Sequence, residues 1–331
     1  MAGRRQKKSG GRSYAWRYRG RIVACVFVEV IIICALVIMI GWNKGVKEWF
    51  EQFEQPVLKE VDISGINSPN AILMQARGGK ILGEINGEAQ IYPASMTKIM
   101  TVILGIENFD DLDEKITLTD EMFAGLYEQD ATQAGFQPGE EVRVIDLLYG
   151  AMLPSGAECC IALADTISGS EADFAELMNK KARKLGMENT HFCDSTGLHN
   201  PDHYSTVKDI AVLMKYCIKN DTFREIVETS RHSTGVTNIH PDGITYYSTM
   251  FKNLSDPTVT GGKILGGKTG YTSEAGHCLV SFAEIEGREY IFVSAGASGA
   301  EGNTIPHIQD AVTVYNRVGV AIEAKMNDNN K

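Results

Sequence analysis

Residues 91–100 have the sequence Ile91-Tyr92-Pro93-Ala94-Ser95-Met96-Thr97-Lys98-Ile99-Met100. Pro93 stands where a helix can begin and an apolar run follows, so the stretch predicts a buried helix with Ser95 in its first turn. Residues three apart share one face of a helix, so the Lys98 amine can reach the Ser95 hydroxyl. An uncharged lysine amine can take the proton from a serine that attacks a carbonyl carbon. Ser95 is therefore a candidate nucleophile and Lys98 its candidate base.

The Ser-x-x-Lys pattern is weak by itself, and the chain holds a second copy at Ser205 and Lys208. There, Thr206 and Asp209 form a capping pattern before an apolar run, which predicts the start of a helix. Taken alone, Ser95 and Lys98 fit a helix cap with a surface lysine about as well as a catalytic pair. The choice between the two depends on motifs further along the chain.

The composition is that of a globular enzyme with an uneven charge. The chain has 331 residues, of which 44% are hydrophobic and 22% charged, and a formal net charge of −10. Residues 1–47 contain ten Lys and Arg residues and one acidic residue, Glu29, which leaves 22 basic and 41 acidic residues, a net charge of −19, for the rest. An acidic main body argues against nucleic acid as a partner.

The segment Ile22–Gly41 is an apolar run of 20 residues interrupted only by Glu29, which is the length that a transmembrane helix needs. Eight Lys and Arg residues precede it, so we expect a cytoplasmic tail at 1–21, a single span at 22–41 and a catalytic domain outside the cell membrane. A cleaved signal peptide is the main alternative. Its apolar region is usually shorter, and no small-x-small cleavage site follows the run.

After the span, the pattern predicts an amphipathic juxtamembrane stalk at 42–63, one domain at 64–325 and a polar tail at 326–331. Within the domain, strands are expected at 71–85 and 263–295, with helices between them at 144–228 and a last helix at 306–324. Strands from the two ends can share one antiparallel sheet, with the helical middle as a second lobe and the site between them. The predicted fold class is therefore α/β of the α+β kind.

Two further motifs follow Ser95 in order. Leu153-Pro154-Ser155-Gly156 breaks the helical region and can present a polar side chain into a cleft. Lys268-Thr269-Gly270-Tyr271 lies on a predicted strand, where it offers an ammonium, a hydroxyl and a bare backbone to a ligand. The three motifs together make a chance occurrence of Ser95-x-x-Lys98 improbable.

With these motifs, the sequence resembles the serine D-alanyl-D-alanine carboxypeptidases, the low-molecular-weight penicillin-binding proteins. The likeness runs from about Pro69 to the last helix. It includes the blocks at 93–98, 137–140, 153–156, 195–198 and 268–270. The resemblance implies a penicillin-binding and β-lactamase-like fold, a peptidoglycan stem pentapeptide ending in D-Ala-D-Ala as substrate, and β-lactam antibiotics as covalent inhibitors. It implies no cofactor and no metal.

The resemblance also assigns roles to single residues. Ser95 is similar to the acylated nucleophile, Lys98 to its base, and Ser155 to the serine that passes a proton to the leaving D-alanine. Lys268 and Thr269, on the strand that continues through Gly270 and Tyr271, resemble the groups that hold the terminal carboxylate of the substrate. The backbone N–H groups of Ser95 and Tyr271 would form the oxyanion hole.

One position departs from the family pattern. The second motif usually has the form Ser-x-Asn, and here its third position is Ala157, which lacks the two donors and one acceptor of an amide. A penicillin-binding relative without turnover, with a wall-binding role, therefore remains an alternative. A β-lactamase would need a second base, and Glu176 lies in a predicted amphipathic helix that faces solvent. A zinc carboxypeptidase is disfavoured because the seven histidines form no H-E-x-x-H motif.

Overall fold

The computed structural model describes residues 58–254, 256–299 and 305–329. The predicted cytoplasmic tail at 1–21, the predicted span at 22–41 and residues 42–57 of the predicted stalk lie outside the described residues. Within the described ranges, no helix combines the length and the apolar character that a membrane span requires.

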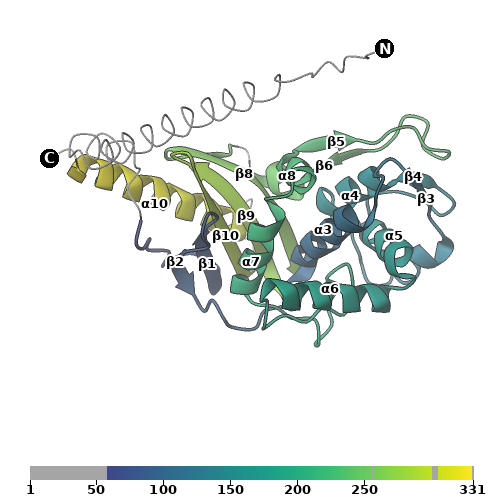
Figure 1. The fold of residues 1–331 in the computed structure, drawn as a ribbon, viewed down its shortest axis with the longest axis horizontal. Helices are drawn as coiled ribbons and strands as arrows, with labels where there is room; N and C mark the ends of the chain where they lie inside the picture. The colour runs from purple at the N-terminus through teal and green to yellow at the C-terminus, as the bar shows by residue number, and fades with distance from the viewer. Residues whose placement is uncertain (1–57, 255, 300–304, 330–331) are drawn as a thin grey trace, which may run out of the picture. The chain divides into compact units, whose positions relative to one another are not determined.

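The described chain forms ten strands, eight α-helices and two short 3-10 helices (Figure 1). The strands are β1 Asn70–Gln75, β2 Ile81–Ile85, β3 Lys115–Thr117, β4 Glu141–Arg143, β5 Arg231–Ser233, β6 Thr245–Tyr247, β7 Thr258–Val259, β8 Gly262–Thr272, β9 Gly276–Ile285 and β10 Arg288–Ala297. The helices are η1 Ala94–Thr97, α3 Lys98–Asn108, η2 Asp120–Phe123, α4 Val144–Met152, α5 Ala157–Ser168, α6 Glu171–Leu185, α7 Val207–Cys217, α8 Asp221–Glu228, α9 Thr249–Asn253 and α10 Pro306–Asn329.

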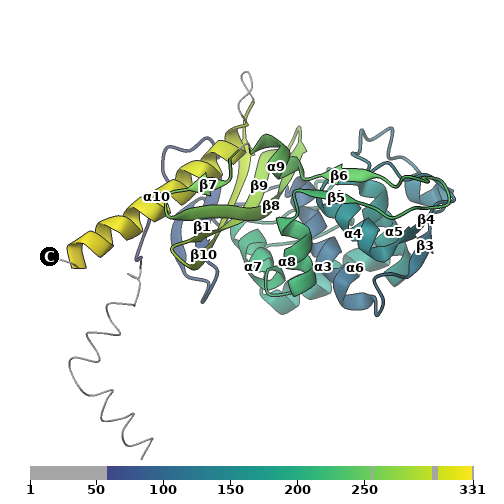
Figure 2. The same ribbon diagram turned by 90° about the horizontal axis from the view of Figure 1, so that it is seen from above.

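Strands from both ends of the described chain form one sheet, as predicted. Its order is β2-β1-β10-β9-β8-β7, and every neighbouring pair is antiparallel. Side chains alternate between the two faces: Ile72 belongs to one hydrophobic core and its neighbour Leu73 to the other. The sheet therefore separates two layers of helices, with α10 on one face and α7 and α8 on the other (Figures 1 and 2).

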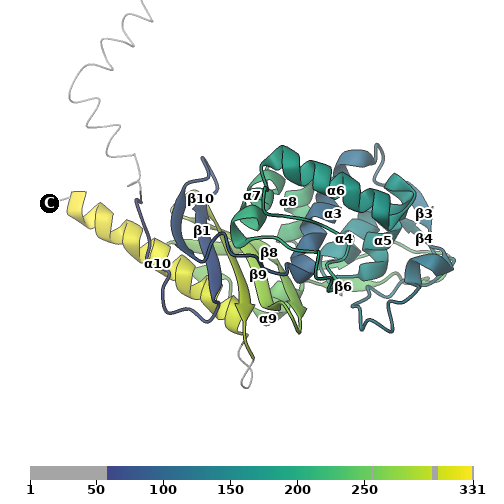
Figure 3. The same ribbon diagram turned by 90° about the horizontal axis from the view of Figure 1, so that it is seen from below.

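The middle of the chain forms a helical lobe around α3, which Figure 3 shows next to α4, α5 and α6. Every residue of α3 from Lys98 to Gly105 is buried. Gly105 allows close packing, since a Cβ there would lie 2.7 Å from Leu148 Cδ2 on α4. The lobe meets the sheet where η1, at the start of α3, contacts β8.

The predicted domain boundaries need two corrections. Residues 58–63 are not part of a stalk, because the side chains of Leu58, Val61 and Ile63 are buried in the same core as α10, and Val61 N donates to Leu82 O at 2.7 Å. At the other end, α10 runs to Asn329, so most of the predicted polar tail at 326–331 continues the helix. Both segments carry apolar residues that cover the α10 side of the sheet.

The carboxylate of Asp310 joins α10 to the segment that leads into β1, and we expect its neutralisation to destabilise the fold. Its oxygens accept hydrogen bonds from Asn67 N, Asn67 Nδ2, Ser68 N and Ser68 Oγ at 2.6–2.9 Å, and the residue is 1% exposed. Asp310→Asn should lower the free energy of unfolding in urea by about 2–3 kcal/mol, because an amide nitrogen would face these donors. Asp62→Asn is the control, since Asp62 is exposed and accepts from Ser64 N, two residues along the chain. Equal losses in the two variants would contradict the prediction.

Candidate active site

Ser95 and Lys98 lie together at the junction of η1 and α3, as the sequence predicts. Ser95 is in η1, which begins directly after Pro93, and Lys98 is the first residue of α3. Lys98 Nζ donates to Ser95 Oγ at 3.1 Å and to the Thr196 carbonyl oxygen at 2.6 Å. The Lys98 side chain is buried, whereas Ser95 is half-buried. The amine is thus held beside a hydroxyl that a ligand can reach.

The second Ser-x-x-Lys copy forms no such pair. Thr206 Oγ1 caps α7 by accepting from Asp209 N at 3.0 Å, as predicted. Ser205 Oγ bonds to Thr190 Oγ1, and Lys208 Nζ pairs with Glu88 on the surface. The same four-residue pattern therefore produces a cap here and a buried amine–hydroxyl pair at Ser95.

The Thr196 carbonyl is fixed by a tight loop around Asp194. Asp194 Oδ1 accepts from Thr196 N, Thr196 Oγ1 and Gly197 N at 2.6–2.7 Å. Gly197 has φ +79°, and a Cβ there would lie 1.9 Å from the Ala94 carbonyl oxygen. Only glycine allows this loop to contact η1 so closely. The loop therefore sets the position of Lys98.

A buried histidine supports the loop from behind. His203 Nδ1 lies 3.0 Å from Asp194 Oδ2, and its Nε2 lies 2.9 Å from Thr97 Oγ1. Burial would raise the pKa of Asp194, but hydrogen bonds from His203, Thr196 and Gly197 hold it at about 2. Asp194 is therefore a carboxylate across the physiological range. Sequence reasoning missed both residues, although an Asp before Ser-Thr-Gly is a signal for a side-chain-stabilised turn.

Ser155 lies on the turn between α4 and α5 in a strained conformation. It has φ +73°, and Ala94 beside Ser95 has φ +47°, which makes them two of the five non-glycine residues with positive φ in the described chain. Ser155 Oγ is buried and has no hydrogen-bond partner among the described residues. Strain of this kind is concentrated at functional sites. An unpaired buried hydroxyl is free to bond to a ligand.

The Lys268–Tyr271 motif lies on β8, next to η1. A Cβ on Gly270 would lie 2.9 Å from Ser95 N, so the strand backbone runs directly beside the Ser95 amide. Lys268 is 1% exposed and its Nζ donates to the Thr269 carbonyl at 2.8 Å. Tyr271 is 62% exposed, and its ring packs 4.6 Å from that of His277. The structure thus brings the first and third motifs into contact.

The environment of Lys268 disfavours its charge. Burial, the largest cause, and the nearby charge of Lys98 lower the pKa of Lys268 well below its usual value. The two amines are therefore close enough to affect each other. An anionic group bound beside Lys268 would favour the protonated form.

The position of the missing asparagine is filled. Ala157 is the first residue of α5 and is 1% exposed, so no water-sized space adjoins its methyl group. Its backbone N–H donates to Thr132 O at 2.8 Å. The next residue, Glu158, is fully buried, and its Oε1 accepts from Ala134 N and Gly135 N at 2.6 and 2.9 Å. Burial raises the pKa of Glu158.

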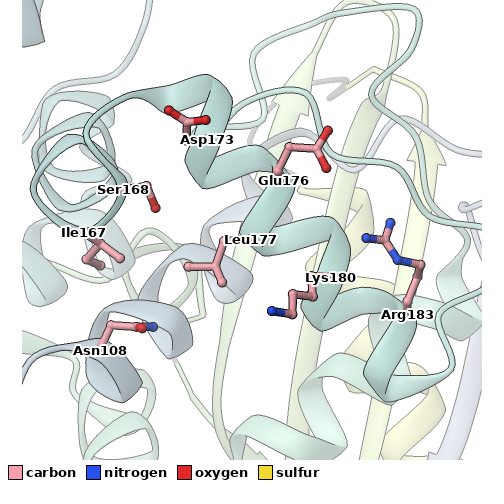
Figure 4. Close-up of a pocket in the computed structure, with 8 residues that line it drawn as sticks. All are labelled: Asn108, Ile167, Ser168, Asp173, Glu176, Leu177, Lys180 and Arg183. Atoms are coloured by element: carbon pink, nitrogen blue, oxygen red, sulfur yellow. The ribbon is translucent and has the colours of Figure 1, made fainter.

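A groove along α6 lies apart from these motifs. Figure 4 shows its lining residues, which are Asn108, Ile167, Ser168, Asp173, Glu176, Leu177, Lys180 and Arg183. None of the motif residues contributes to this lining. Glu176 is exposed, as predicted, and Asn179 bonds to the backbone of Phe192.

Residues 57–299 match the Peptidase S11 family, which is described as D-alanyl-D-alanine carboxypeptidase. The chain belongs to this family. It is similar to D-alanyl-D-alanine carboxypeptidase DacF of Bacillus subtilis, with 35% identity over 69% of this chain and 57% of the relative. Its identity to DacC of Escherichia coli is 33%, over 72% of this chain and 58% of DacC. The match thus spans less than two thirds of the length of either relative.

Solved structures agree with this assignment. The crystal structure of the Streptomyces K15 DD-transpeptidase superposes with a TM-score of 0.69 and 29% identity, covering 81% of this chain and 99% of that protein. The family therefore confirms the predicted penicillin-binding-like arrangement of an antiparallel sheet and helices. The roles of Ser95, Lys98, Ser155, Lys268, Thr269, Gly270 and Tyr271 stay predictions that the geometry above supports.

Replacing Lys268 should increase the stability of the fold and abolish its activity. In the unfolded chain Lys268 has an ordinary pKa of about 10.4, whereas in the folded protein its pKa is well below this. The free energy of unfolding of the wild type should therefore rise with pH between the folded and the unfolded pKa, and it should be lowest below the folded pKa. Lys268→Met should raise the free energy of unfolding at pH 7 by about 1–3 kcal/mol, flatten this pH dependence and abolish reaction with penicillin.

Lys263→Met is the matched control, because Lys263 lies on the same strand with an exposed side chain. Its unfolding free energy and its reaction with penicillin should both stay close to wild type. If the free energy of unfolding of Lys268→Met at pH 7 were lower than that of the wild type, burial of Lys268 would not destabilise the fold, and the prediction would be wrong.

Proposed function

We propose that the protein is a serine-type carboxypeptidase that removes the terminal D-alanine from peptidoglycan stem pentapeptides through an acyl-enzyme on Ser95. The observation that carries the proposal is the 3.1 Å hydrogen bond from Lys98 Nζ to Ser95 Oγ, at the edge of the Lys268 strand. Membership of the D-alanyl-D-alanine carboxypeptidase family supports the substrate class. The residues described above support each proton transfer and the stabilisation of each charge.

In the proposed reaction, the Lys98 amine acts as the base and takes the proton of Ser95 Oγ as the oxygen attacks the carbonyl carbon of the penultimate D-alanine. The backbone N–H groups of Ser95 and Tyr271 stabilise the negative charge on the carbonyl oxygen. The hydroxyl of Ser155, which bonds to no other described residue, gives its proton to the leaving amine and takes one back from Lys98, so the C–N bond breaks, D-alanine departs and Lys98 is again a base. Water then cleaves the ester and restores Ser95. Lys268 and Thr269, on the strand that includes Gly270, hold the terminal carboxylate of the substrate.

The alternatives differ in the fate of the acyl-enzyme. A β-lactamase would release a penicilloyl group quickly, and a wall-binding relative without turnover would release no D-alanine. β-Lactams should act on the proposed enzyme as covalent inhibitors that form a long-lived ester.

Ser95→Ala should abolish the covalent penicillin adduct, since no other side chain of the site supplies the attacking oxygen. Lys98→Arg should lower the acylation rate by about a hundredfold or more, because a guanidinium keeps its charge and cannot act as the base. Mass spectrometry of the intact chain after exposure to penicillin, together with an assay of D-alanine release from a stem pentapeptide, measures both effects.

The second Ser-x-x-Lys copy provides matched controls. Ser205→Ala and Lys208→Arg change the same residue types in a segment that holds no amine–hydroxyl pair, and they should leave acylation unchanged. Normal labelling of Ser95→Ala would refute the assignment of the nucleophile. A wild-type adduct that disappears within seconds would favour a β-lactamase, and a stable adduct without any D-alanine release would favour the wall-binding relative.

We further propose that residues 22–41 anchor the enzyme in the cell membrane, with residues 1–21 in the cytoplasm and the catalytic domain outside. The support is the one-sided charge of the sequence around this apolar run. Protease added to intact protoplasts should digest the catalytic domain and leave an epitope within the first 20 residues protected. Protection of the catalytic domain would contradict this orientation.

A further inference from the structure

The short helix α9 places a second threonine beside the Lys268 strand. Met250 on α9 is buried, and its Sδ lies 2.7 Å from the position that a Cβ on Gly267 would occupy. This close contact packs α9 onto β8 one residue before Lys268, and Figure 2 shows α9 beside this strand. Thr249, the first residue of α9, thereby comes to lie next to Thr269.

The two threonine hydroxyls form a pair. Thr249 Oγ1 and Thr269 Oγ1 are 2.7 Å apart, and both residues are half-buried. The backbone of Thr249 is fixed on both sides: its N–H donates to Leu153 O at 3.1 Å, and its carbonyl accepts from Asn253 Nδ2 at 2.7 Å. Since Leu153 begins the turn that carries Ser155, Thr249 connects the second motif with the third.

We propose that Thr249 supplies a second hydroxyl, beside that of Thr269, to bind the terminal carboxylate of the substrate. This inference rests on the function proposed above. A hydroxyl is both donor and acceptor, so one proton of the pair serves their mutual bond and the other is available. A carboxylate only accepts, and it has two oxygens, so it can take the protons of both hydroxyls. Hydrogen bonds to a charged oxygen are stronger than the neutral bond that they replace.

The position of the pair favours binding over a purely structural role. Thr269 follows the buried Lys268 in the strand, and Thr249 adds a donor from a different element. A second hydroxyl pair, Ser233 Oγ and Thr245 Oγ1 at 2.9 Å, joins β5 to β6 on the exposed surface of the hairpin. That pair has similar geometry but lies outside the motif strand, so it provides a control for the loss of such a bond.

The test compares two reactive thioester substrates that have the same acyl group. In one the leaving group carries a free carboxylate, and in the other that carboxylate is a methyl ester. The proteins are the wild-type chain, Thr249→Val, which keeps the shape without the hydroxyl, Thr249→Ser, which keeps the hydroxyl, and the control Thr245→Val. Steady-state kcat and KM are measured for each protein with each substrate.

Thr249→Val should lower kcat/KM for the free carboxylate by about ten- to a hundredfold, mainly through a higher KM, with little change for the methyl ester. Thr249→Ser should restore most of the preference, and Thr245→Val should behave as wild type. Equal losses on both substrates, or no loss on either, would overturn the assignment of Thr249 while the proposed function stands. A wild-type chain that reacts with neither thioester would overturn the proposed function and this inference with it.

Discussion

The site depends on the buried amine of Lys98. This amine must lie within hydrogen-bond distance of the Ser95 hydroxyl and must keep a second hydrogen-bond acceptor. Its two partners have different origins. Ser95 is three residues away, and helix geometry alone brings it close. Thr196 is 98 residues away, so its carbonyl oxygen reaches the amine only because a distant loop is held rigidly. The carboxylate of Asp194, with three bonds to that loop and one to His203, meets this requirement.

Glycine makes the remaining contacts possible, because the site is built where backbones meet with no side chain between them. Gly197 brings the Asp194 loop against η1, and Gly270 brings β8 against the Ser95 amide. A methyl group at either position would separate the elements that carry the motifs. Since β8 belongs to the sheet and η1 to the helical lobe, the Gly270 contact also joins the two halves of the domain. At Gly270, the packing of the fold and the geometry of the site therefore depend on the same residue.

The sequence predicted those features of the fold that are determined by residues close together in the chain. The helical middle expected at 144–228 begins with α4 at Val144 and ends with α8 at Glu228. The order of strands and helices led to the correct sheet, because apolar periodicity depends on neighbouring residues. It failed where a residue's role depends on a distant partner. Residues 58–63 form no regular pattern, and their apolar side chains are buried in a core that they share with α10 and the sheet. Similarly, Asp194, His203 and Thr249 are ordinary polar residues in the sequence, and only the folded chain places them beside Lys98 and Thr269.

The second motif shows how the chain supports Ser155 without the usual asparagine. The strained turn is held by backbone bonds, from Gly156 N to Gly150 O and from Ala157 N to Thr132 O, both at 2.8 Å. The buried carboxylate of Glu158 reinforces it by accepting from Ala134 and Gly135. None of these bonds involves the side chain at position 157, so replacing an amide there with a methyl group leaves the position of Ser155 intact. The two donors and the one acceptor of an amide are absent from this position. Substrate binding must therefore rely more heavily on β8 and on the elements packed against it.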